Sequence, residues 1–383
     1  MGTRSGPKHQ FWPQLIFWAS IGTVLYTFFG YPLLAYLLAQ YRRRPVKQAA
    51  ITPTVTLLIA AYNEEAVIVE KIENSLQLEY STDLLQIVIV ADGSDDETVA
   101  LAEQYTEQGV TVYHQPGRQG KAAAINRVMP LISQEIVVFS DANTMLDPAA
   151  LKLLMRNFAD PTVGGVAGEK RVIGGGEGLY WRYESSLKRW DSAVSSVMGA
   201  AGELFAIRRE LFQPPEEDAI IEDFVISLRL VAAGWRVVYE AEAAALEAPS
   251  PSLAGEWQRR ARNAAGGFRS IQRLPELWHP GLGLITWQYF SHRVLRWAVT
   301  PFLLPFIYLI NLVMWTNPLF MVMLIGQTIF YSLAVLGYIL ERLGKKWKPA
   351  QIVFYFCFTN AAAIAGFWRH LTRRQPVTWP KIR

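Results

Sequence analysis

The chain has 383 residues, which is enough for two or three domains with a sizeable core. Its formal net charge is only +4, and its basic residues gather beside apolar segments, so contact with anionic lipid is favoured over nucleic-acid binding. The single cysteine, Cys357, excludes an internal disulfide and a cysteine-based metal site.

The N-terminal segment is typical of a retained membrane anchor. Residues 11–40 carry no charged side chain, and at ~1.5 Å per residue they form about 45 Å of helix. That length crosses the ~30 Å hydrocarbon layer with a tilt or a break near Gly30, and it exceeds the apolar stretch of a secretory signal. The basic residues 42–44 and Lys47 follow, which places the next part of the chain in the cytoplasm.

A second apolar block lies at the other end of the chain. Residues 298–340 predict two spans separated at 316–318, and 350–368 predict a third apolar segment. The basic stretch 341–348 belongs inside, but a complete crossing by 350–368 would put the basic tail outside, against the same rule. This last segment is therefore either a span or a re-entrant or interfacial segment.

These segments predict three parts in a multi-pass protein of the cell (inner or plasma) membrane. Residues 1–46 form an N-terminal membrane anchor, 47–275 a cytoplasmic domain, and 276–383 interfacial and C-terminal transmembrane helices.

The middle domain alternates apolar strands with helical stretches. Strands are expected within 54–65, 84–98, 111–116 and 135–144, which predicts an α/β domain with a parallel sheet. Three acids, Glu64, Asp92 and Asp141, fall where strands end. Because ligands bind at the carboxyl ends of parallel strands, these acids predict a ligand site.

Each motif also has a purely structural interpretation. Asp92 begins a segment that can form a turn and a helix cap, and Glu64 can start a helix. Lys121 can simply be a solvated side chain. The occurrence of the acids at successive strand ends favours a shared site over these separate roles.

In chain order the motifs are AAYNEE, ADGSDDET, GRQGKAAAIN, FSDANT and IIEDF, and together they resemble those of membrane-bound family 2 glycosyltransferases. The resemblance covers about 52–275, and the flanking spans match the layout of membrane synthases for cellulose, hyaluronan and poly-N-acetylglucosamine. It implies a GT-A catalytic domain, with a mostly parallel sheet flanked by helices and with transmembrane helices at both ends. It also implies a nucleotide-sugar donor, usually a uridine diphosphate sugar, and inversion at the anomeric carbon.

The resemblance assigns roles by position. Catalysis falls to Asp223 as the base with Glu222 beside it, and the divalent metal to Asp141 with Asn143. The nucleotide-sugar pocket is implied to comprise Ala60, Tyr62, Glu64, Asp92 and Lys121.

The chemistry suits these residue types. Mg²⁺ or Mn²⁺ can neutralise a departing diphosphate, and such ions bind carboxylates together with substrate phosphates and water. Asn143 stands where the family often has a second Asp. An inverting transfer needs one base for the acceptor hydroxyl, and Glu222 and Asp223 can alternatively cap the helix that they begin.

Processive members of the family carry Gln-x-x-Arg-Trp, and this chain has EWQRRARNAAGG at 256–267. In the register that fits better, the motif starts at Arg259, Arg262 takes the arginine position, and Asn263 replaces the tryptophan. Arg259 and Arg262 are thus expected to contact the diphosphate or the acceptor. The same stretch is amphipathic and can equally lie on the membrane surface.

The sequence is compatible with three functions. The first is a metal-dependent, inverting glycosyltransferase that extends a cell-surface or extracellular polysaccharide. The second adds a single sugar to a lipid-linked acceptor, and the third is a non-catalytic membrane scaffold. The expected partners are a nucleotide-sugar donor, a glycan or lipid-linked acceptor and membrane lipid, with no nucleic acid.

Overall fold

The computed structural model describes residues 11–173, 178–249 and 252–378. These residues form two compact units. Among the described residues, the sheet unit comprises 35–173, 178–249, 252, 269–289 and 376–378, and the helical unit comprises 11–34, 253–268 and 290–375.

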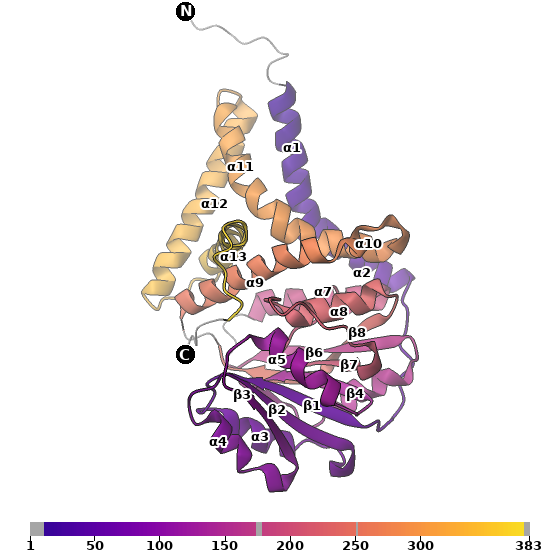
Figure 1. The fold of residues 1–383 in the computed structure, drawn as a ribbon. Helices are drawn as coiled ribbons and strands as arrows, with labels where there is room; N and C mark the ends of the chain where they lie inside the picture. The colour runs from indigo at the N-terminus through magenta and orange to yellow at the C-terminus, as the bar shows by residue number, and fades with distance from the viewer. Residues whose placement is uncertain (1–10, 174–177, 250–251, 379–383) are drawn as a thin grey trace, which may run out of the picture. The chain divides into compact units, whose positions relative to one another are not determined.

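The sheet unit is built on one eight-stranded sheet with strand order β3-β2-β1-β4-β7-β6-β8-β5 (Figure 1). The strands are β1 (Val55–Ala61), β2 (Leu85–Asp92), β3 (Val110–Gln115), β4 (Ile136–Asp141), β5 (Thr144–Leu146), β6 (Val163–Val172), β7 (Phe205–Arg208) and β8 (Arg236–Glu247). Strands β1 to β4 are parallel to one another, and β6 is parallel to β8. Strand β7 pairs antiparallel with β4 and β6, and β5 pairs antiparallel with β8. The four predicted strands are confirmed, and the sheet is mixed but mostly parallel.

Helices cover both faces of this sheet. They are α3 (Ile68–Leu76), α4 (Thr98–Glu103), α5 (Lys121–Val128), α6 (Ala150–Met155), α7 (Gly178–Val194) and α8 (Glu222–Ala232). In Figure 1, α3 and α4 lie on one side, and α5, α7 and α8 lie on the other. Double coverage explains why β1 is a continuous apolar run and does not alternate with polar residues.

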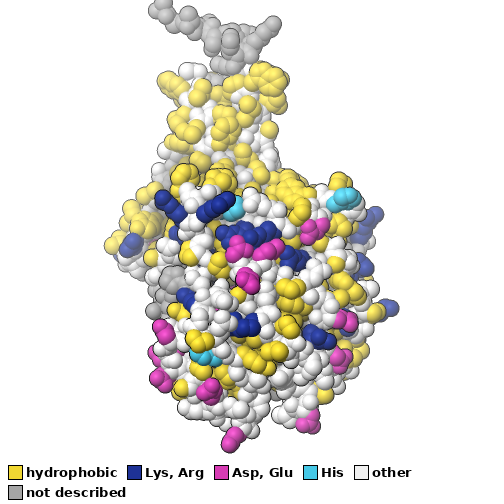
Figure 2. Space-filling view, in the orientation of Figure 1, with side chains coloured by type: hydrophobic (Ala, Val, Ile, Leu, Met, Phe, Trp, Pro, Cys, Tyr) yellow, Lys and Arg dark blue, Asp and Glu magenta, His cyan; other side chains and the backbone are white. Residues whose placement is uncertain are grey.

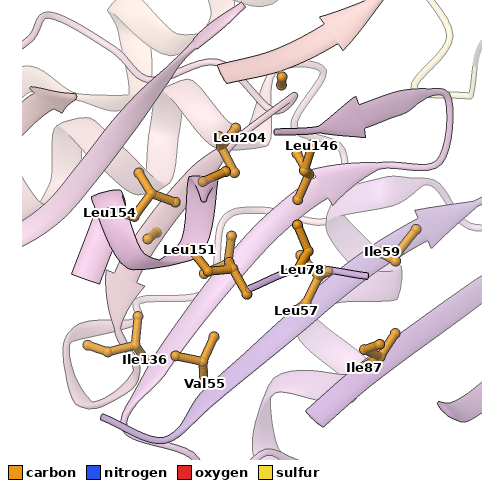
Figure 3. Close-up of a cluster of buried hydrophobic side chains, with 14 of the residues drawn as sticks. Val55, Leu57, Ile59, Leu78, Ile87, Ile136, Leu146, Leu151, Leu154 and Leu204 are labelled. Carbon is orange, nitrogen blue, oxygen red and sulfur yellow. The ribbon is translucent and has the colours of Figure 1, made fainter. Parts of the chain in front are cut away.

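The main core lies between the sheet and the helices α3 and α6 (Figure 3). Val55, Leu57 and Ile59 of β1 meet Leu151 and Leu154 of α6 there, and all five are fully buried. Each side chain of this kind contributes roughly 1.5–3 kcal/mol of transfer free energy. The packing holds the middle of β1 rigidly, so the residues at its carboxyl end have a fixed position.

The helical unit contains most of the apolar helices. Its elements, some of which continue into the sheet unit, are α1 (Phe11–Leu25), α2 (Tyr31–Tyr41), α9 (Leu253–Arg273), α11 (Thr300–Val313), α12 (Pro318–Arg342) and α13 (Lys348–Leu371). The short helix α10 (Leu284–Tyr289) belongs to the sheet unit. A π-helical turn, Tyr26–Gly30, joins α1 to α2 at the expected break, and another, Phe290–Val299, joins α10 to α11.

Four helices within the described ranges are long and apolar enough to cross a membrane, namely Phe11–Tyr41, Leu284–Val313, Pro318–Arg342 and Lys348–Leu371. Large hydrophobic side chains such as Leu309, Val322 and Ile329 are exposed on them. Figure 2 shows hydrophobic side chains gathered over these helices, with few charged ones among them. This surface is suited to lipid.

Candidate active site

Strand register brings the predicted acids to one edge of the sheet. Ala60 of β1 lies opposite Asp141 of β4, and Ala61 lies opposite Ala91 of β2. Because these strands are parallel, their carboxyl ends coincide. Asp92 and Asp141 therefore flank the end of β1, as the sequence predicts.

Asp92 anchors the loop that precedes α5. Its Oδ2 accepts hydrogen bonds from the backbone N–H groups of Gln119 and Gly120, at 3.0 and 2.6 Å. Its Oδ1 is buried and accepts no hydrogen bond from the described residues, and Arg127 Nη2 lies 3.8 Å from it. A buried acceptor without a donor favours a ligand N–H at this position.

Arg118, a residue of the motif GRQGKAAAIN to which the sequence assigned no role, lies on Tyr62. Its guanidinium carbon is 3.4 Å from the centroid of the Tyr62 ring, a cation–π stack. Gly93 permits this approach, because a Cβ at that glycine would come within 2.6 Å of Arg118, and its φ of +73° favours glycine. Tyr62 thus offers one flat, aromatic face beside Asp92.

The Glu64 segment is tied to the loop after β2. Glu64 N–H donates to Thr98 Oγ1 at 2.7 Å, and the Glu64 carbonyl accepts the first amide hydrogen bonds before α3. Asn63 Nδ2 donates to Asp95 Oδ1 at 2.6 Å. These contacts fix both loops together, and a role for the Glu64 carboxylate in nucleotide binding stays a prediction.

Lys121 forms the centre of an acidic cluster. Its Nζ lies 2.6 Å from Asp141 Oδ1 and 2.8 Å from Glu222 Oε1. Burial opposes the charge on Lys121, but the carboxylates of Asp141, Glu222 and Asp223 raise its pKa well above the ordinary value. The site therefore holds a permanent positive charge between residues from β4 and α8.

Asp223 lies in the first turn of α8, beside Glu222. Burial, reinforced by the negative charge of Glu222, raises the pKa of Asp223 to about 7. A carboxyl group with a pKa near neutrality can take up and release a proton. The Glu222 carboxylate binds Lys121, and the Asp223 carboxylate accepts a hydrogen bond from the backbone N–H of Phe224 in the same helical turn. Asp223 can therefore support the start of α8 and also act as a base.

Gly202 is a further residue that the sequence did not indicate. A Cβ at this position would lie 2.9 Å from Lys121 Nζ and 3.5 Å from Asp223 Oδ2. The absence of a side chain here leaves room around the acids, and the only signal was a glycine within the small-residue run GAAG.

Asn143, the second residue predicted to bind the metal, is hydrogen-bonded to a network of buried charges. Its Nδ2 donates to Glu247 Oε1 at 3.0 Å, and Glu247 in turn pairs with the buried ammonium of Lys170. Lys170 also binds Glu203 Oε1 at 2.6 Å. Asn143 is thus held by a buried charge network, and its amide oxygen stays available as an acceptor.

The donor set at Asp141 and Asn143 fits a hard divalent cation in kind, because it consists of oxygen atoms. Across residues 11–173, 178–249 and 252–378, no group of three or more His, Cys, Asp or Glu side chains could hold a metal ion. Mg²⁺ or Mn²⁺ is often held by one or two carboxylates with substrate phosphates and water. The residues therefore suit an ion shared with a phosphate ligand and not a closed protein cage.

Arg259 and Arg262 lie on α9, within the helical unit. Both the Nε and the Nη2 of Arg259 donate to Glu256, at 3.0 and 2.7 Å, and Glu256 is buried. The guanidinium of Arg259 is thus already held by a neighbouring carboxylate. The assignment of these two arginines to a diphosphate or an acceptor stays a prediction.

Comparisons with known proteins place this geometry in context. Residues 53–266 match the sequence model of the family described as glycosyltransferase like family 2. A beta-monoglucosyldiacylglycerol synthase of Trichormus variabilis is 28% identical over 280 residues, which cover 69% of this chain and 59% of the relative. A poly-beta-1,6-N-acetyl-D-glucosamine synthase of Staphylococcus aureus is 29% identical over 231 residues, covering 57% and 56%.

The chain thus spans between 56% and 59% of the length of these curated relatives. Among solved structures, the mannosyltransferase PcManGT from Pyrobaculum calidifontis, in complex with GDP-Man and Mn²⁺, superposes with a TM-score of 0.72. It is 23% identical, and the match covers 94% of this chain and 99% of that chain. At this identity the likeness shows a common fold.

Proposed function

This chain belongs to the glycosyltransferase like family 2, and on that premise we propose that it transfers a sugar from a nucleoside diphosphate donor to an acceptor hydroxyl, with inversion. The observation that carries the proposal is the cluster of Asp141, Lys121, Glu222 and Asp223 at the carboxyl ends of the parallel strands. In this cluster, Asp223 is a base with a raised pKa, and Lys121 carries a fixed positive charge. The reaction needs a base for the acceptor hydroxyl and positive charge for the leaving diphosphate.

The donor binds along the loops after β1 and β2. The nucleobase stacks on the Tyr62 ring, and its N–H donates to Asp92 Oδ1, which accepts no hydrogen bond from the described residues. Uridine diphosphate sugars are the first donors to test. Asp141 and Asn143 would hold Mg²⁺ or Mn²⁺, and the ion would supply positive charge to neutralise the diphosphate.

In the transfer step, the Asp223 carboxylate takes the proton of the acceptor hydroxyl while the oxygen of that hydroxyl attacks the anomeric carbon of the donor sugar. The bond from that carbon to the diphosphate breaks, and its electron pair leaves with the diphosphate. The permanent charge on Lys121 favours this negative leaving group. Glu222 holds Lys121 in place through the 2.8 Å ion pair.

A growing cell-surface polysaccharide is the acceptor that we propose first, in keeping with the similarity to a poly-N-acetylglucosamine synthase. A specific observation favours a second candidate. The similarity to a glucosyldiacylglycerol synthase, together with Asn263 where processive enzymes carry tryptophan, supports transfer of one sugar to a membrane lipid. Product length separates the two, because a ladder indicates processive extension and one product indicates single transfer.

The test is release of nucleoside diphosphate by the detergent-purified protein with Mg²⁺ or Mn²⁺. The panel comprises uridine diphosphate sugars and guanosine diphosphate mannose. We expect turnover with one donor, and Asp223→Asn lowers kcat by about 100- to 10,000-fold while the Kd for that donor stays within about threefold. Asp218→Asn is the matched control, and we expect it to keep its activity. Asp218 is an exposed acid in the loop before α8, where it pairs with Arg273 of α9.

An equal loss of donor binding in Asp223→Asn would contradict its role as the base. Where no donor turns over, calorimetry with the same panel decides between two explanations. Tight metal-dependent donor binding means that the acceptor is missing, whereas no binding favours the non-catalytic scaffold.

A further inference from the structure

Lys71 is a fully buried lysine that the proposed reaction does not use. It lies on α3 with Ile68, Ile72 and Ser75, at the spacing of one helix face, and all four side chains are buried. Three of these residues pack as expected on the apolar side of a helix. A lysine in the same stripe is costly, because its ammonium is removed from water.

The ammonium of Lys71 reaches the turn that carries the proposed metal residues. Its Nζ donates to Ser140 Oγ at 2.8 Å and to the carbonyl oxygen of Thr144 at 2.6 Å. Ser140 directly precedes Asp141, and Thr144 directly follows Asn143. One side chain thus bridges the residues on either side of the Asp141–Asn143 turn between β4 and β5.

The turn has further polar ties on the same buried side. Ser140 Oγ also lies 3.2 Å from the Glu203 carbonyl, and Thr144 Oγ1 donates to the Asp141 carbonyl at 3.0 Å. Ser140 and Thr144 are both buried, so water cannot replace a lost partner. Burial lowers the pKa of Lys71 to about 7, and the negative charge of Asp141 opposes that shift.

We propose that Lys71 is a positioning residue that fixes the Asp141–Asn143 turn in the shape that binds the divalent cation. The proposal rests on the metal site in the proposed function and deepens it. Outer partners that orient metal ligands typically change metal affinity by 10- to 100-fold when they are removed. The described hydrogen bonds of Lys71 go to the Thr144 carbonyl and to Ser140, and none goes to a carboxylate oxygen of Asp141.

The test measures Mn²⁺ binding to the purified full chain by calorimetry, with uridine diphosphate present and absent. Lys71→Met keeps the length and apolar stem but removes the donors, and we expect the Kd for Mn²⁺ to rise about 10-fold or more. Thr56→Val is the matched control. Thr56 is equally buried but lies at the other end of the sheet, where it donates to Gln134 Oε1 at 3.0 Å. We expect this control to lower thermal stability and to leave the Mn²⁺ affinity unchanged.

Ser140→Ala removes the acceptor and leaves Lys71 in place, so it tests the same contact if Lys71→Met does not fold. We expect weaker Mn²⁺ binding in Ser140→Ala, and a double variant that is less than additive, because both changes remove one interaction. Unchanged Mn²⁺ affinity in these variants, with stability lost, overturns the proposal and assigns Lys71 a structural role only. Wild-type protein that binds no Mn²⁺ and transfers sugar in the presence of a chelator overturns the metal assignment and this inference, while the glycosyltransferase proposal survives.

Discussion

The carboxyl group of Asp223 is partly buried in the first turn of α8, next to a second acid. Desolvation and the charge of Glu222 raise its pKa to about 7. A general base works only when it is ionised, so the fraction of active enzyme falls tenfold for each pH unit below that pKa. The raised pKa of Lys121 keeps this residue charged across the same range.

We therefore expect kcat/KM to rise with pH up to about 7 and to level off above it. The measurement is a pH profile of donor turnover between about pH 5 and 9, at saturating metal. Asp218→Asn serves again as the control and has the wild-type profile. A profile that is flat below pH 7 would show that another group takes the proton.

The buried charges at the far strands act at the scale of the sheet. Lys170 of β6 is 2% exposed and pairs with Glu203, just before β7, and with Glu247 at the end of β8. Burial opposes ionisation of Glu203, but the ammonium of Lys170 lowers the pKa of Glu203 to about 2. One lysine therefore ties three neighbouring strands through two carboxylates.

Lys170→Met leaves both carboxylates without their cation, and removal of one partner from a buried pair typically costs about 3–5 kcal/mol. We expect a loss of about 3 kcal/mol, since the two acids keep some exposure to water. Thermal unfolding in detergent measures it. Lys152→Met, which breaks an exposed pair with Glu79, is the control and costs at most about 1 kcal/mol. Equal losses in the two variants would contradict a special role for the Lys170 network.

The stability from Glu203 also depends on pH in a defined direction. Its folded pKa lies below the ordinary value, so this stability is present at neutral pH and is lost as the pH falls through about 4.5 toward about 2. Lys170→Met weakens that dependence, because the ammonium of Lys170 is the largest of the influences that lower the pKa of Glu203.

The strands differ in how far they could be predicted from the sequence. The strands β1, β2 and β4 were predictable because each is a continuous apolar run that stops at a polar residue. The long strands β6 and β8 were not, since VGGVAGEKRV and RVVYEAEAAALE mix glycine, alanine and charge. Their pairing depends on partners distant in the chain, which local patterns do not report.

The site divides in the same way. Asp92, Asp141 and Lys121 were found because they follow strands or loops with recognisable motifs. Gly202 was missed because tertiary packing brings it to the site, and Arg118 was given no role although it lies within the motif GRQGKAAAIN. Lys71 had a usable signal, namely a charged residue at a position of the apolar helix face.

At the scale of the whole molecule, the sequence left the role of 350–368 open. A contact within the sheet unit helps to decide whether this segment crosses the membrane. Val377, which follows α13, lies close to Gly120, since a Cβ at Gly120 would be 2.9 Å from Val377 Cγ1. The tail after α13 thus packs against the loop at Asp92 and must be on the same side of the membrane as the sheet. If Leu284–Val313 and Pro318–Arg342, which are long and apolar enough, both cross, the chain returns to that side before α13 begins.

A full crossing by α13 would then put the tail on the wrong side. Within the helical unit, Figure 1 shows α13 end-on, whereas α1, α11 and α12 are seen from the side. Gly366 of α13 packs closely on α9, where its Cβ would meet the Ala261 carbonyl at 2.6 Å. The amphipathic helix α9 carries Arg259, Arg260 and Arg262, which suits a position at the membrane surface. We infer that three helices cross and that α13 lies in the interface, although its length and composition would allow a span.

Single-cysteine labelling tests this topology, because Cys357→Ser gives a chain without cysteine. A membrane-impermeant thiol reagent is applied to intact and to opened cells carrying one of three exposed probes, Glu107→Cys in the sheet unit, Arg374→Cys after α13 or Thr316→Cys between α11 and α12. We expect Arg374→Cys to behave like Glu107→Cys, and Thr316→Cys to show the opposite accessibility. Should Arg374→Cys instead follow Thr316→Cys, α13 crosses the membrane and the tail cannot reach the Gly120 loop. Labelling of Glu107→Cys only after the cells are opened would in addition place the catalytic side in the cytoplasm, as the basic residues 42–44 predict.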